Sequence, residues 1–220
     1  NIYLNKIGKF NLQGSFNNIS LNSILMQSQS ANWDRLDVKI SSEKFAISGE
    51  NMEGKDIINS IVGTIPINGS MYFVTSDDER FGIAFLTLLV EKMPSLSSIS
   101  RSINFIVSNY ANSPSTLSGE IKLNSGIMTS ENIVISNNSN RLILKGIYDL
   151  QNDNLDGKIF FYEKDENILE AKLVGNINDP QILVKGKNIF ENKSEPYQDI
   201  KKLLSDGINS FIERILTKDE

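Results

Sequence analysis

The chain has 220 residues, a mass of 24.6 kDa, 40% hydrophobic residues and a net charge of −5, which suits a folded domain with a buried core. It contains no histidine and no cysteine, which excludes the usual zinc, iron–sulfur and haem sites and any histidine-based or cysteine-based catalysis. The acidic balance argues against electrostatic binding of nucleic acid. We therefore expect no cofactor and no nucleic-acid partner, and carboxylates are the only common catalytic groups left.

No segment of this sequence has the pattern expected of a signal sequence or of a membrane-spanning helix. The chain starts at Asn1, and the longest apolar run, from Phe81 to Val90, is about half the length of a membrane-spanning helix. We expect the chain to be part of a longer protein whose membrane anchor lies elsewhere.

Alternation of apolar and polar residues at period two predicts β-strands along most of the chain. The alternation begins at Phe10 and Leu12, and it recurs around Val38 and around Phe45. Short polar turns separate the later strands, which predicts an antiparallel meander with one apolar face. These turns are expected at residues 137–140, 151–157, 165–167 and 178–180. In the second half, the apolar face is expected to consist of Ile121, Leu123, Ile133, Ile135, Leu142, Leu144, Leu169, Leu173, Ile182 and Val184.

Two segments in the middle of the chain predict helices instead of strands. A short helix is expected from Ile57 to Val62, and Gly63 would close it. Acidic residues precede a second helical segment at residues 81–93, where they favour a helix start. Residues 96–110 are expected to continue as a further helix.

The end of the chain predicts an amphipathic helix. Ser194 as N-cap and Pro196 in the first turn precede a helical pattern from Tyr197 to Lys218. This helix could lie on a lipid surface or cap the apolar face of the sheet. Its polar side carries charges of both signs, which favours capping. Its apolar side carries Ile200, Leu204, Ile208, Phe211 and Ile215.

These patterns together predict a β-rich α+β fold. We expect an antiparallel meander sheet that forms a curved, groove-like surface, accompanied by two or three helices and the C-terminal amphipathic helix. One β-rich domain would cover residues 1–193, with a sub-boundary near residues 112–115, and the helix would follow at residues 194–220.

Residues 152–163 match part of an EF-hand calcium loop, with Gly157 at the position of the sharp turn. Strand patterns flank this segment where an EF-hand needs helices, and the first position lacks the usual carboxylate. A polar hairpin turn is therefore the favoured interpretation. The weak candidate ligands for calcium are Asn152, Asn154, Asp156 and Glu163.

Paired carboxylates are the only catalytic option that the composition leaves. The pairs lie in turns or at helix starts, and no aromatic cluster accompanies them, which favours solvated side chains over an active site. We therefore expect no enzymatic activity. The pairs are Asp34 with Asp37, Asp77 with Asp78, and Asp165 with Glu166.

An ordered set of motifs covers residues 45–185. It comprises a short helix that ends in glycine, a strand, a second helix and a series of glycine-containing strands. The motifs are Gly54–Gly63, Ile67–Met71, Phe81–Leu89, Leu117–Ile127, Leu142–Leu150, Leu155–Gly157 and Leu173–Ile182. Their order and spacing resemble the C-terminal region of AsmA-like bacterial envelope proteins, a family that includes TamB and YhdP types.

The resemblance implies a non-enzymatic periplasmic protein of a Gram-negative bacterium, attached to the inner membrane through an N-terminal segment missing from this sequence. Such proteins guide phospholipid between the inner and outer membranes along an apolar β-groove and so contribute to outer-membrane assembly. The expected partners are phospholipid acyl chains or envelope proteins, with membrane contact through other parts of the protein.

Two alternatives stay open at this point. The apolar residues of the second half could line an open lipid groove, or they could form a filled core under the helices. A rival hypothesis from another class is an extracytoplasmic module that binds a protein partner by strand addition and has no lipid site.

Overall fold

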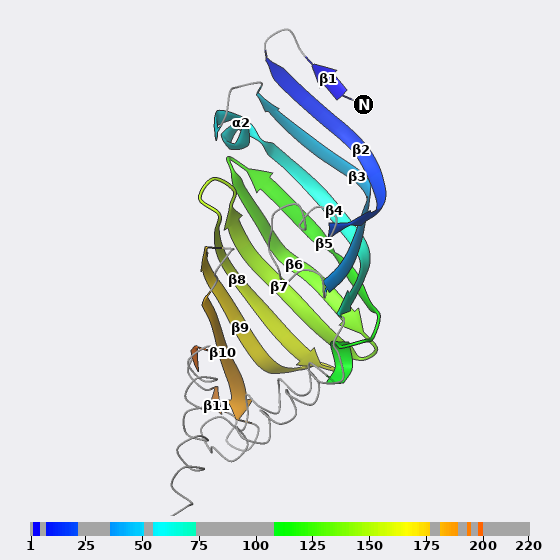
Figure 1. Cartoon of the computed structure of the whole chain (residues 1–220), viewed down its shortest axis with the longest axis vertical. Helices are drawn as coiled ribbons and strands as arrows, with labels where there is room; N and C mark the ends of the chain where they lie inside the picture. The colour runs from blue at the N-terminus through cyan, green and yellow to red at the C-terminus, as the bar shows by residue number, and fades with distance from the viewer. Residues whose placement is uncertain are drawn as a thin grey trace, which may run out of the picture.

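The computed structural model describes residues 2–4, 8–21, 36–50, 55–73, 108–176, 181–188, 193–194 and 198–199. In this part of the chain the architecture is a single antiparallel sheet whose strand order follows the chain from β1 to β11, with β12 paired beside β10. Figure 1 shows the strands stacked from the N-terminal end at the top to β10 and β11 at the bottom, with a marked twist along the stack. The β-rich antiparallel meander predicted from the sequence is therefore confirmed.

The elements have the following bounds. They are β1 (Ile2–Leu4), β2 (Lys9–Ser20), β3 (Leu36–Glu50), α2 (Lys55–Ser60), β4 (Val62–Phe73), β5 (Ser115–Asn124), β6 (Ile127–Asn137), β7 (Asn140–Asp149), β8 (Asn154–Glu163), β9 (Glu166–Asn176), β10 (Gln181–Asn188), β11 (Lys193–Ser194) and β12 (Gln198–Asp199).

Tight turns between β5 and β9 fix the meander. Ser125 and Gly126 both have positive φ, at 52° and 77°, which matches the twist of the two flanking strands. Asn138 and Asp153 also have positive φ, at 52° and 51°, in the turns predicted from their asparagine and aspartate content. A turn at Lys164, with φ of 55°, completes the series of hairpins.

The long strands are interrupted by bulges that the sequence pattern did not indicate. Val38 and Phe45 both belong to β3, and the pairing of β3 with β4 shifts register between Ser41 and Ala46. A similar shift lies between Ser130 and Ile133, where β6 pairs with β7. A bulge adds a residue without ending the strand, so the alternation can restart on the same face.

The register brings most of the apolar residues of the long strands onto one side of the sheet, because side chains alternate between the two sides of a strand. We call this side the apolar face. It comprises Phe10, Leu12, Val38, Ile40, Ile47, Ile65, Ile67, Met71, Leu117, Ile121, Leu123, Met128, Ile133, Ile135, Leu142, Leu144, Tyr148, Leu155, Ile159, Phe161, Leu169, Ala171, Leu173 and Val184.

The opposite side, which we call the polar face, carries ion pairs between strands. Glu170 forms ion pairs with Lys185 at 2.8 Å and with Lys158 at 3.9 Å, measured from Nζ to a carboxylate oxygen. Lys172 and Asp156 pair at 3.7 Å on the same strands. Mixed charges in this arrangement are typical of a solvated sheet surface.

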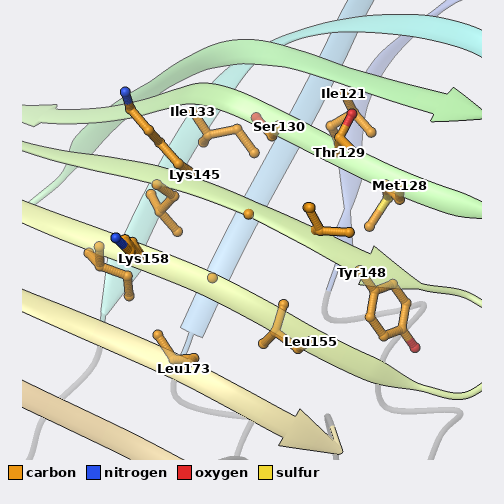
Figure 2. Close-up of a pocket in the computed structure, with 15 residues that line it drawn as sticks. Ile121, Met128, Thr129, Ser130, Ile133, Lys145, Tyr148, Leu155, Lys158 and Leu173 are labelled. Atoms are coloured by element: carbon orange, nitrogen blue, oxygen red, sulfur yellow. The ribbon is translucent and has the colours of Figure 1, made fainter.

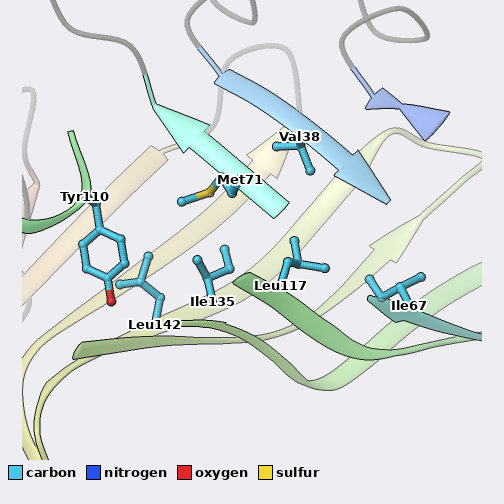
Figure 3. Close-up of a cluster of buried hydrophobic side chains, with 7 residues drawn as sticks. All are labelled: Val38, Ile67, Met71, Tyr110, Leu117, Ile135 and Leu142. Atoms are coloured by element: carbon cyan, nitrogen blue, oxygen red, sulfur yellow. The ribbon is translucent and has the colours of Figure 1, made fainter. Parts of the chain in front are cut away.

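A buried cluster occupies one end of the apolar face (Figure 3). Leu117, Ile135 and Leu142 lie opposite one another on three neighbouring strands, and each is at most 8% exposed. Tyr110, from the helical residues 108–110, packs onto the same cluster and is 4% exposed. The remaining members are Val38, Ile67 and Met71.

Three sequence-based expectations about element ends were wrong. Helix α2 ends at Ser60, and Gly63 lies inside β4, where a Cβ would come within 2.4 Å of the Ala46 carbonyl oxygen. Glycine at this position therefore permits close strand approach instead of capping a helix. At the other end of the chain, Ser194 lies in β11 and Gln198–Asp199 pairs with β10, so sheet pairing replaces the expected N-cap and first helical turn.

The remaining expected helices lie mostly outside the described residues, and the expected sub-boundary falls at a point where the sheet is continuous. The helix at residues 81–93, most of the helix at 96–110 and the helix residues after 199 lie outside the described ranges. The sub-boundary near residues 112–115 falls where the chain enters β5, and β5 pairs with β4 from Met71 and Ser115 to Val62 and Asn124.

Candidate functional site

A hollow of about 200 Å³ indents the apolar face at the end opposite the buried cluster. The residues around it come from β5 to β9, and Figure 2 shows their side chains. They are Ile121, Met128, Thr129, Ser130, Ile133, Leu144, Lys145, Gly146, Ile147, Tyr148, Leu155, Gly157, Lys158, Ile159 and Leu173.

The floor of the hollow is a row of small residues across three strands. Ser130 pairs with Gly146, and Gly146 pairs with Gly157 on the next strand. Because these residues project little or nothing above the backbone, the sheet surface is depressed along the row. Leu173, opposite Gly157 on β9, ends the row on one side.

Large apolar side chains form the two long walls. Met128, Tyr148 and Leu155 are register partners on β6, β7 and β8 and lie along one wall (Figure 2). The other wall is formed by a second set of register partners. These are Ile133, Leu144 and Ile159.

The two polar side chains of the walls and floor already have hydrogen-bond partners. The Ser130 hydroxyl donates to the Glu120 carbonyl oxygen at 2.9 Å. The Tyr148 hydroxyl donates to Asp153 Oδ1 at 2.7 Å. Desolvation by burial, together with this hydrogen bond and the nearby carboxylate charges, raises the pKa of Tyr148 to about 12. The hollow therefore presents aliphatic surface and a neutral phenol.

The turn after β7 anchors Tyr148 from outside the hollow. Asp149 Oδ1 accepts hydrogen bonds from the backbone N–H groups of Gln151, at 2.9 Å, and Asn152, at 3.2 Å. The side-chain amide of Asn152 donates to the other carboxylate oxygen at 2.8 Å. These bonds, led by the Asn152 side chain, lower the pKa of Asp149. The turn is thus held in one conformation beside the wall.

Helix α2 lies at the same end of the sheet. The Gln151 side chain donates to Asn59 Oδ1 on α2, and a Cβ at Gly126 would meet that oxygen at 3.0 Å. The Ser60 hydroxyl accepts from the Glu50 backbone N–H at 2.8 Å, which ties α2 to β3. These contacts fix the position of the hairpin turns next to the hollow.

A set of side-chain hydrogen bonds holds Tyr110, which covers the buried cluster, in place. Asn137 Nδ2 donates to the Asn109 carbonyl oxygen at 2.7 Å and to the Ser113 hydroxyl at 2.9 Å. Asn140 Nδ2 donates to Asn109 Oδ1 at 2.9 Å. We call Asn109, Ser113, Asn137 and Asn140 the asparagine clamp. It seats Tyr110 on the apolar face, and the sequence pattern gave no signal for it beyond asparagine richness near the β6–β7 turn.

The predicted lipid-groove residues separate into two groups in the structure. Ile121, Ile133, Leu144 and Leu173 line the hollow, whereas Ile135, Leu142, Leu169 and Val184 are at most 8% exposed. Leu123 lies opposite Met128 and Gly63 on the same face. Ile182 pairs with Leu173 through the backbone, and its side chain lies outside the described part. The floor glycines Gly146 and Gly157 were not predicted as site residues, although their pairing follows once the meander register is drawn.

The weak calcium candidates do not converge on a common site. Asn152 lies in the turn before β8, while Asn154 and Glu163 are the two ends of that extended strand. Asp156 forms an ion pair with Lys172 on the polar face. Within the described residues, no group of three or more carboxylates could hold a metal ion. Residues 150–153 form the turn of the β7–β8 hairpin, in which Asp153 has a φ of 51°.

The carboxylate pairs and the capping helix are only partly covered by the structure. Asp165 is in the β8–β9 turn and pairs with Arg141 at 3.0 Å, with 97% of its side chain exposed, as expected for a solvated turn. Asp37 faces Lys39 at 3.6 Å. The partners at residues 34, 77 and 78 lie outside the described ranges, as do the capping-helix residues Ile200, Leu204, Ile208, Phe211 and Ile215.

No protein-family model, curated protein or solved structure matches this chain. Across the described ranges, no helix combines the length and the apolarity needed to cross a bilayer.

Proposed function

We propose that this chain is the lipid-handling part of an AsmA-like envelope protein and that its apolar face accommodates phospholipid acyl chains. The observation that carries the proposal is the hollow on that face, whose walls are largely apolar and whose Ser130 and Tyr148 hydroxyls already have hydrogen-bond partners. A ligand that needs no hydrogen-bond partner fits such a site best.

The size of the hollow suits part of an acyl chain. An apolar cavity of about 150 Å³ holds one benzene ring, so a hollow of about 200 Å³ takes about eight carbon groups. Each methylene moved from water into this site contributes about 0.8 kcal/mol. The binding energy therefore comes from apolar contact, and it requires neither a metal nor a charged side chain.

The sequence motifs supply the biological setting of the proposal. Their resemblance to AsmA-like proteins supports a periplasmic location in a Gram-negative bacterium and a role in moving phospholipid to the outer membrane. In that setting the described sheet guides the acyl chains, and segments outside the described ranges contact the membrane. We propose no enzymatic activity.

Photo-crosslinking tests the acyl-chain site. Phosphatidylcholine that carries a diazirine at the end of one acyl chain is incubated with the protein in vesicles and irradiated, and labelled residues are identified by mass spectrometry. We expect label on Leu144, Leu155 and their neighbours in the hollow.

A matched pair of variants makes the test specific. Leu155→Asn places an amide in the wall of the hollow, and Val174→Asn makes the same kind of change at a half-buried residue of the polar face. We expect the first variant to lose most of the label and the second to retain it. Equal labelling of the two variants, or label confined to the polar face, would contradict the proposal. Capture of a protein partner without lipid label would favour the strand-addition hypothesis.

A further inference from the structure

The two glycines of the floor, Gly146 and Gly157, differ in how much space the structure leaves for a side chain. A Cβ on Gly146 would lie 2.9 Å from the Gly157 Cα and 3.1 Å from the Asp156 carbonyl oxygen. Both obstacles are backbone atoms of the neighbouring strand, which cannot move aside as a flexible side chain can. The close approach of β7 and β8 therefore requires glycine at position 146.

Gly157 has no such structural requirement among the described residues. A Cβ there would meet the Lys145 carbonyl oxygen at 3.6 Å and a Leu155 methyl group at 3.7 Å, which are ordinary van der Waals distances. Its φ is not in the left-handed region. Glycine inside a strand destabilises the strand relative to alanine, so position 157 carries a cost that neither packing nor backbone geometry explains.

The missing side chain at Gly157 is what leaves the floor of the hollow open. The floor is closed at one end by Leu173 on β9 and flanked by Ile121 from β5. An acyl chain that enters between the two walls therefore meets Leu173 at the end of the floor and cannot pass straight through the hollow. A site with these boundaries fits the terminal segment of one chain better than the middle of a chain.

We infer that Gly157 is the specificity-determining residue of the hollow and that the occupant is the methyl-terminal segment of a single acyl chain. This inference rests on the proposed function, because it presupposes that acyl chains reach the apolar face. It adds the part of the ligand that is bound and the residue that sets the depth of the site.

Binding of a fluorescent sixteen-carbon fatty acid, with the fluorophore near the carboxyl end, tests the inference. The protein is compared with Gly157→Ala and Gly157→Leu. Gly14→Ala and Gly14→Leu serve as controls, since Gly14 also lies on a strand without left-handed φ and outside the hollow, and a Cβ added there would meet the Phe45 ring at 3.4 Å. Each methylene excluded from the hollow lowers affinity about fourfold. We expect losses of about fourfold for Gly157→Ala, which adds one carbon, and roughly two-hundredfold for Gly157→Leu, which adds four, with affinity retained in both Gly14 variants.

The outcomes separate the inference from the proposed function. If the unchanged protein binds the fatty acid and the folded Gly157 variants bind it equally well, the inference is overturned and the proposed function stands. If the unchanged protein binds no fatty acid, the proposed function fails and the inference fails with it. Thermal unfolding of each variant shows that it is folded, and Gly157→Ala alone decides the matter if Gly157→Leu does not fold.

Fatty acids of different length and shape provide an independent test of which part of the acyl chain is bound. Shortening the fatty acid to eight carbons should leave affinity sensitive to Gly157→Ala, because the terminal segment still fills the hollow. A fatty acid whose last carbons carry a bulky ring should bind weakly to every variant. Tight binding of that ring-tipped probe would overturn the assignment of the chain end.

Discussion

The two ends of the apolar face have the same strand alternation and differ in how the face is filled. At one end, Leu117, Ile135 and Leu142 form a continuous buried row under Tyr110. At the other end, the equivalent row is Ser130, Gly146 and Gly157, and a hollow takes the place of the core. Side-chain size along a single row across the sheet therefore decides whether a stretch of this face is core or binding surface.

The largest expected difference between the two ends is in stability. Leu142→Ala removes a buried side chain and should lower the free energy of unfolding by about 2–5 kcal/mol. Leu155→Ala, at a half-buried wall of the hollow, should cost about 1 kcal/mol. Urea unfolding of the two variants measures both values. Equal losses of unfolding free energy would contradict the assignment of one end as core and the other as hollow.

The asparagine clamp gives the next largest effect, at the covered end. Asn137 is 5% exposed, and its side-chain amide makes two hydrogen bonds. Asn137→Ala leaves two partly buried acceptors, on Asn109 and Ser113, without their donor and should lower the free energy of unfolding by about 1–3 kcal/mol. Asn132→Ala, at an exposed position of the same strand, is the control and should cause little change. A similar loss in both variants would show that the clamp does not hold the cover.

A substitution at Tyr110 should stabilise the end of the apolar face that carries the buried cluster. The Tyr110 hydroxyl is buried without a hydrogen-bond partner among the described residues, so Tyr110→Phe should raise the free energy of unfolding by about 1 kcal/mol. Burial also raises the pKa of Tyr110 to about 12. Because the neutral phenol is favoured in the folded state, stability should be full below pH 10 and fall as the pH rises from about 10 to 12.

Alkaline unfolding curves then compare the two tyrosines. Tyr148, at the hollow, shares the direction of the pKa shift and should contribute to the same loss. Tyr110→Phe and Tyr148→Phe should each flatten part of the stability profile above pH 10. A profile that neither variant changes would contradict burial of the two phenols.

The smallest expected effect is at the turn beside the hollow. Hydrogen bonds within the turn, led by that of the Asn152 side chain, lower the pKa of Asp149 from its ordinary value of 3.8. A lowered pKa stabilises the fold at pH values above the unfolded pKa, and this contribution disappears as the pH falls through the folded pKa, below about 4. Asp149→Asn should make stability less dependent on pH in that range. Thermal unfolding between pH 5 and pH 2 measures the difference, and an unchanged slope would contradict it.

Period-two alternation predicted the strands and the face to which most of their apolar residues belong. It could not predict the bulges, because the extra residue near Ser41 or Ser130 leaves the pattern intact on both sides. It also ranked Leu142 and Leu144 alike, although only the first is fully buried. Burial depends on the neighbouring strands and on Tyr110, which come from distant parts of the sequence.

The hollow could have been found from sequence with one further step. Pairing β7 with β8 through the short turn at residues 150–153 aligns Gly146 with Gly157, and aligned glycines on an apolar face indicate a depression. The asparagine clamp could not have been found this way. Asn109 lies in a segment where helical periodicity is the only signal, and nothing in that pattern indicates its partners on β6 and β7.

Strand order that follows chain order also determines how the molecule can assemble. Each hairpin from β5 to β9 closes a short loop, whereas β4 and β5 meet only after the chain has passed through residues 74–114. Closing that longer loop costs more entropy and slows the step that depends on it. We therefore expect two nuclei, β2–β4 and β5–β9, that form independently and join along the β4–β5 seam. In pulsed hydrogen exchange, the amides of this seam should acquire protection last.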